Sequence, residues 1–92
     1  MSSTYEKELE DILIEVEASI SRILLSKDRT SKHPPYTWLE EDVNEHLIKA
    51  ARHILTHINI NSGYQEHTGE NHLDNAICRL AMAVAKQQKD GK

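Results

Sequence analysis

Apolar residues spaced three and four positions apart run through Trp38–Ile60, WLEEDVNEHLIKAARHILTHINI, and constrain the fold more than any other stretch. At 3.6 residues per turn this spacing predicts an amphipathic helix. The apolar positions are Leu39, Val43, Leu47, Ala50, Ile54 and Ile58. Ile48, Ala51 and Leu55 widen the apolar face to about half of the helix surface. We therefore expect a central helix over about 38–58, buried by neighbouring segments or by an oligomer.

Two further apolar stripes predict helices on either side of the central one. Residues 5–26 carry Leu9, Ile12, Leu13, Val16, Ile20, Ile23 and Leu24. Residues 71–88 carry Leu73, Ala76, Ile77, Leu80, Ala81 and Val84. Thr4 is expected to cap the first helix, and polar segments at 27–36 and 59–70 are expected to be loops. The pattern predicts one all-α domain of three helices, two long and antiparallel and the third shorter.

The small size of the chain indicates that its core buries little surface and gives only marginal stability. It has 92 residues, no Phe and 4% aromatic residues, so Ile, Leu, Val and Ala must supply the buried surface. Chains of this size bury little more than about 60% of their unfolded surface. We therefore expect a homo-oligomer that completes a helical bundle.

Charge and hydropathy exclude several classes of partner. The net charge is −4 and no block of Lys and Arg is present, so nucleic acid is a poor partner. No apolar run reaches the roughly 18 residues of a membrane span, and the polar, acidic start is unlike a signal peptide. Cys78 has no second cysteine to pair with, which fits a cytoplasmic protein.

Acidic residues on the central helix are candidates for a metal site. Glu41 and Glu45 lie one turn apart with Asp42 between them, and Asp74 could join them from the third helix. Mg²⁺ and Mn²⁺ prefer oxygen ligands, usually a few carboxylates together with substrate phosphates. The alternative is a solvated acidic face near a helix N-terminus, which the helix dipole favours. Glu40 has a structural use instead, since Thr37 and Glu40 match a capping box.

Basic residues in the 27–36 segment are candidates for binding an anion. Lys27, Arg29, Lys32 and His33 lie close together there, either in a solvated connector or in a loop that faces a phosphate.

The histidines give a weaker metal signal. His53 and His57 are one turn apart, a spacing that zinc sites use, but no Cys-x-x-Cys or His-Glu-x-x-His is present. Surface or interface histidines are the alternative. Cys78 lies on an apolar face and is interpreted as a packing residue.

Two pieces of the chain carry a family resemblance. The run HLIKAARHILTHINI, followed after a polar loop by TGENHLDNAICRLAMAV, resembles phage and bacterial dATP/dGTP diphosphohydrolase-like proteins. The matching residues are Arg52-His53, Thr68-Gly69, His72-Leu73 and Ala76 to Arg79. The resemblance covers roughly residues 34–86.

That family is similar in character to the MazG-like all-α nucleoside triphosphate pyrophosphatases. Those enzymes carry Glu-Glu-x-x-Glu on one helix and Glu-x-x-Asp on a later one. Here residues 41–45 (Glu-Asp-Val-Asn-Glu) and 71–74 (Asn-His-Leu-Asp) stand at those places, with Asn71 where the family has Glu. The resemblance implies Mg²⁺ or Mn²⁺ ligated by Glu41, Asp42, Glu45 and Asp74, with Glu41, Glu45 and Asp74 catalytic. The residues expected to contact the nucleotide are Lys27, Arg29, Lys32, Lys49, Arg52, His53 and His72.

Two functions stay open from the sequence. The first is a metal-dependent pyrophosphohydrolase of (deoxy)nucleoside triphosphates, in which the metal neutralises phosphate charge and activates water. The second is a small non-catalytic helical phage protein that binds a nucleotide or inhibits a host protein through its oligomeric surface. Asn71 in place of a charged ligand favours the second.

Overall fold

Four α-helices and one short 3-10 helix make up the computed structural model, which describes residues 3–61 and 71–91. The helices are α1 (Thr4–Leu24), α2 (Lys27–Lys32), α3 (Val43–Asn61) and α4 (His72–Asp90), with the 3-10 helix η1 (Thr37–Glu40) before α3. No strand occurs in the described residues, so the predicted all-α fold is confirmed. The three long helices are of similar length, and the third is not shorter as expected.

Helix α4 occupies the centre of the fold, in place of the helix expected there. It packs against α3 over most of its length and against α1 at one end, whereas the described parts of α1 and α3 do not pack against each other. Most of the buried residues belong to α4: His72, Asp74, Ala76, Cys78, Met82 and Ala83. The small residues among them, Ala76, Cys78 and Ala83, allow the neighbouring helices to approach α4 closely.

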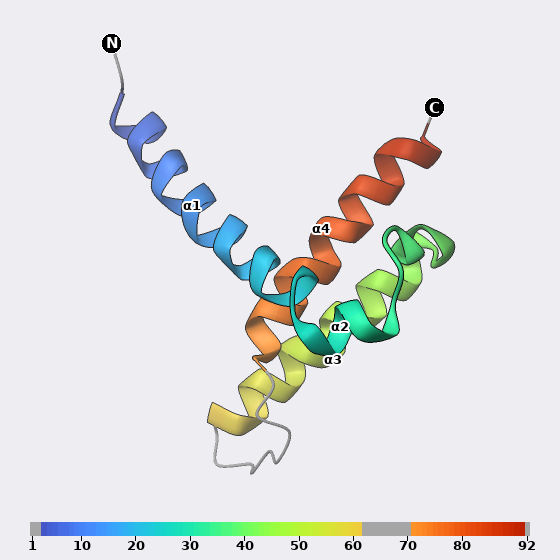
Figure 1. The fold of residues 1–92 in the computed structure, drawn as a ribbon. Coiled ribbons are helices and arrows are strands. Elements are labelled where there is room, and N and C mark those ends of the chain that lie inside the picture. Colours follow the sequence, from blue (N-terminus) through green and yellow to red (C-terminus); the bar gives the residue numbers. More distant parts are fainter. Residues whose placement is uncertain (1–2, 62–70, 92) are drawn as a thin grey trace.

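The first helix stands apart along its N-terminal half. Figure 1 shows α1 and α4 diverging from the point where they cross, with the two chain ends at the far ends of the helices. Leu9, Ile12 and Leu13, three residues of the predicted apolar stripe, are each more than half exposed. The helix begins with Ser3 as its cap, not Thr4, because the Ser3 hydroxyl accepts a hydrogen bond from the Glu6 backbone N–H at 3.0 Å.

The expected loop at 27–36 contains a helix. Ser26 caps α2 by accepting a hydrogen bond from the Arg29 backbone N–H at 3.3 Å. The helix ends at Lys32, two residues before the prolines, since the residue preceding a proline avoids the helical conformation. This turn of helix places Arg29 and His33 beside α4, as described below.

The expected helix over 38–58 is broken near its start. Tyr36 adopts a left-handed conformation with φ of 69°, and Glu41 is extended, so Thr37–Glu40 forms η1 and α3 begins only at Val43. The capping box does not form, because the Thr37 hydroxyl donates to the Pro34 carbonyl at 3.1 Å. Helix α3 continues to Asn61, past the predicted end.

None of the helices in the described residues is long and apolar enough to cross a membrane.

Candidate functional site: a cleft beneath helix α2

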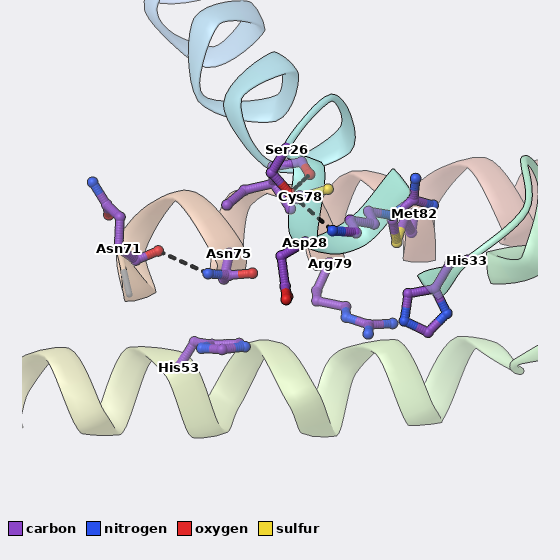
Figure 2. A pocket seen from close by; sticks show the side chains of 11 residues that line it. Ser26, Asp28, His33, His53, Asn71, Asn75, Cys78, Arg79 and Met82 are labelled. Atoms are coloured by element: carbon purple, nitrogen blue, oxygen red, sulfur yellow. Dashed lines mark hydrogen bonds between the residues drawn. The ribbon is translucent and has the colours of Figure 1, made fainter. Parts of the chain in front are cut away.

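Two adjoining cavities lie between α2, α3 and α4. The larger has a volume of about 590 Å³ and the smaller of about 320 Å³. Both are lined by Arg29, His33, Arg79 and Met82, so they form one open cleft. Figure 2 shows Arg79 extending from α4 toward α3, with Asp28 and His33 on the α2 side and His53 on α3.

Arg79 is the residue that links the cleft to its supporting helices. Its Nη1 donates to Glu41 Oε2 at 2.8 Å and lies 3.1 Å from His46 Nδ1. Glu41 also forms an ion pair with Lys49 from α3. The extended backbone at Glu41, which breaks the expected helix, is what turns its carboxylate toward these two cations.

The ionisation of Glu41 is fixed by this arrangement. Burial by itself would raise the pKa of Glu41, but the hydrogen bonds and charges of Lys49 and Arg79 together lower it to about 2. The carboxylate is therefore ionised at neutral pH and holds the Arg79 guanidinium in place. Glu41, Lys49 and Arg79 together carry one net positive charge.

His46 supports Arg79 from below the cleft. It is fully buried, and its Nε2 lies 2.8 Å from the Trp38 carbonyl oxygen. Because a carbonyl only accepts, Nε2 carries the hydrogen, which leaves Nδ1 as an acceptor for Arg79. The chain Trp38–His46–Arg79–Glu41 joins η1, α3 and α4, and gives Arg79 one orientation.

Arg29 lines both cavities of the cleft without a carboxylate partner among the described residues. Its Nη1 donates to the Leu24 carbonyl at 3.4 Å, a long hydrogen bond, and it forms no ion pair within residues 3–61 and 71–91. The acid of the larger cavity, Asp28, is itself paired with Lys32 at 3.0 Å. Arg29 and Arg79 therefore give the larger cavity a positive balance.

The wall and floor of the larger cavity carry neutral polar and apolar groups. Asn71 and Asn75 lie at the start of α4, and Ile23, Cys78 and Met82 supply apolar surface. Beneath this end, His53 Nδ1 lies 2.8 Å from His72 Nδ1, with ring centroids 5.1 Å apart. One of the two nitrogens must carry the hydrogen and the other accept it. This contact joins α3 to α4 beside the larger cavity.

The predicted nucleotide-contacting residues divide into two groups. Arg29, Lys49 and His53 line the cleft, and His72 lies against His53. Lys27, Lys32 and Arg52 are exposed and lie outside the lining.

The four carboxylates predicted to hold a metal are not brought together. Asp74 forms a two-point ion pair with Arg22 of α1, with Nε–Oδ2 at 2.7 Å and Nη2–Oδ1 at 3.0 Å. The hydrogen bond from Arg22 lowers the pKa of Asp74 more than burial raises it. Asp42 and Glu45 are exposed. Asp74 and Arg79 are five positions apart, so at 100° per residue Asp74 points about 140° away from the Glu41 side of α4.

The arrangement of the other described side chains that could bind a metal agrees with this separation. No group of three or more His, Cys, Asp or Glu side chains in the described residues could hold a metal ion. Two further residues with possible metal-ligand side chains, His67 and Glu70, lie outside the described residues.

Sequence reasoning missed Arg79, His46 and Trp38 as site residues. Arg79 gave a signal, because it is a lone charge in the apolar run AICRLAMAV. His46 gave none, since its burial depends on the break that starts α3 at Val43.

No protein-family model, no curated protein and no solved structure matches this chain. The resemblance to the dATP/dGTP diphosphohydrolase-like family stays a prediction.

Proposed function

We propose that this protein binds a phosphorylated nucleotide in the cleft beneath α2 and holds it without hydrolysis. The observation that carries the proposal is the pair of arginines, Arg29 and Arg79, that line both cavities together with His33. A guanidinium matches the oxygens of a phosphate with two parallel hydrogen bonds. Arg29 has no carboxylate competing for it among the described residues.

The shape and chemistry of the cleft support a nucleotide over a bare phosphate. The volume of about 590 Å³ falls within the range of small-molecule sites. The apolar surface from Ile23, Cys78 and Met82 suits the face of a base, and the amides of Asn71 and Asn75 offer donors and acceptors to its edge. The phosphates would then lie toward Arg29 and Arg79.

Binding is favoured over hydrolysis by the state of the carboxylates. Glu41 and Asp74, the two least exposed of the four predicted ligands, are each neutralised by an arginine. A metal would have to displace these cations. The nucleotide-binding alternative from the sequence therefore fits the geometry better than the pyrophosphohydrolase.

A thermal-shift titration with each dNTP and NTP, with and without Mg²⁺, tests the proposal. We expect nucleotide alone to raise the melting temperature by several degrees. Arg29→Ala should weaken binding by about tenfold to a hundredfold, since a charged hydrogen bond contributes about 1.5–3 kcal/mol. Lys27→Ala is the matched control, an exposed cation of the same helix outside the lining, and should bind like the wild type.

Two results would overturn this function. The first is an absence of any nucleotide response at millimolar ligand. The second is release of pyrophosphate in the presence of Mg²⁺ or Mn²⁺ that Glu45→Gln abolishes, which would establish the hydrolase instead.

A further inference from the structure

Helices α3 and α4 each carry a line of apolar side chains, and in the described chain all of them are exposed except Ile77, which α1 partly covers. On α3 the line is Leu47, Ala51, Ile54 and Ile58, and on α4 it is Leu73, Ile77, Leu80 and Val84. Leu73 is 47% exposed, Ile58 51% and Val84 58%. Both lines follow the four-three-four spacing that packs one helix against others in a left-handed bundle.

The two helices carry the same pattern in the same phase. His46-Leu47 with Ala50 on α3 corresponds to His72-Leu73 with Ala76 on α4, 26 residues later. The contacts between the helices obey the same relation. His46 contacts Arg79, and the residues 26 positions from these two, His72 and His53, contact each other. The α3–α4 hairpin therefore has an approximate two-fold axis perpendicular to both helices.

This symmetry puts both apolar lines on one side of the hairpin. On each helix the residues that face the other helix lie about 100° from the apolar line, in the same sense of rotation. Because α3 and α4 run antiparallel, equal rotations turn both lines toward the same side. We call this surface the α3–α4 face. On α4 the cleft residues Asn75, Cys78 and Met82 lie about 170° from the line, so the cleft opens on the opposite side.

The size of the exposed surface points to a large partner. The chain exposes 7137 Å², whereas a folded monomer of 10.5 kDa exposes about 5,400 Å². The excess of about 1,700 Å² per chain is shared between α1 and the α3–α4 face, and it exceeds the roughly 800 Å² that each partner buries in a standard interface. The radius of gyration, 15.1 Å, likewise exceeds the roughly 12 Å of a compact chain of this length.

We propose that a second copy of this chain covers the α3–α4 face, so that two hairpins form a four-helix bundle. A second copy fits because all four helices would then present the same apolar spacing, and a face that repeats itself under a two-fold rotation pairs with its own equivalent. No charged residue interrupts the two apolar lines. Both nucleotide clefts stay open on the outer sides of the dimer.

Sedimentation equilibrium with single charge variants tests this interface. The wild type should have twice the mass of one chain at micromolar concentration, and its melting temperature should rise with concentration. Ile54→Glu and Leu80→Glu should each weaken the dimer at least a hundredfold. Leu13→Glu is the matched control, because Leu13 is an apolar residue of α1 outside the face and is more exposed than Ile54 or Leu80, and this variant should stay dimeric.

A mixing experiment separates lost association from lost folding. Ile54→Glu and Ile54→Lys should each be weakly associated alone, and should form a one-to-one heterodimer when mixed. A wild type that is monomeric and cooperatively folded at 100 µM contradicts the proposal. So does an oligomer that Ile54→Glu and Leu80→Glu leave intact.

Discussion

Replacing Glu41 by Gln removes the charge that holds Arg79 and Lys49. The pKa of Glu41 falls from 4.5 to about 2, and each pKa unit corresponds to about 1.36 kcal/mol. The full shift amounts to about 3 kcal/mol of folding free energy at neutral pH. Lys49 is 42% exposed along its side chain, so water screens its share, and we expect Glu41→Gln to destabilise the fold by about 1.5–3 kcal/mol.

The pH dependence of this loss follows from the direction of the pKa shift. The pKa of Glu41 is lower in the folded state, so its stabilisation is complete above the unfolded pKa of about 4.5. It disappears as the pH falls through the folded value near 2. The difference in unfolding free energy between wild type and Glu41→Gln should therefore be constant from pH 7 to about 5.5 and shrink steadily toward pH 2. Asp74 titrates in both proteins, so its contribution cancels.

Urea unfolding followed by circular dichroism at 222 nm, at one protein concentration and a series of pH values, measures this difference. Glu45→Gln is the matched control, since Glu45 is exposed and forms no ion pair with the described residues. Glu45→Gln should lower the free energy of unfolding by less than about 0.5 kcal/mol. A loss for Glu41→Gln that is equally small, or that does not change between pH 6 and 3, would refute the reasoning.

Three further predictions concern the supports of the fold and the cleft. Asp74→Asn should lower the free energy of unfolding by about 2 kcal/mol, because Arg22 then loses its carboxylate partner. The same change should make α1 more sensitive to limited proteolysis. Arg52→Ala, at an exposed position, should have neither effect. His46→Phe should lower the free energy of unfolding in urea by about 2 kcal/mol or more, because the Trp38 carbonyl and Arg79 each lose a buried partner; an unchanged midpoint would contradict the role of His46 as a support of Arg79. Burial raises the pKa of the Cys78 thiol more than Arg29 and Arg79 lower it, so iodoacetamide at pH 8 should react at least tenfold more slowly with the folded protein than in 6 M urea, and equal rates would contradict this.

The helix spacing predicted the all-α fold because local periodicity reports the faces of single helices. It did not predict which helix is central, since that depends on contacts between segments far apart in the chain. The stripes on α3 and α4 look alike in the sequence. Only the packing shows that, among the long helices of the described residues, α4 packs against both α1 and α3 whereas α3 packs against α4 alone.

The candidate site was predicted in part for a similar reason. Arg29 and Lys49 could be named from their charge and His53 from the family resemblance, and all three line the cleft. The turn of helix at α2 and the extended Glu41 could not be read from a polar segment and a continuous apolar pattern. Those two local departures place Arg29 over α4 and turn Glu41 to Arg79, and they create the site.

The most direct test of the nucleotide-binding cleft is an NMR titration that follows the arginine Nε–H resonances. Arginine substitutions would assign the signals of Arg29 and Arg79, and dATP would be added without metal. The predicted result is a saturable shift of both signals that corresponds to one binding site per chain, with no shift of the Arg52 signal. Nucleotide binding that leaves Arg29 and Arg79 unshifted, or no binding at millimolar dATP and the other dNTPs, would contradict the account.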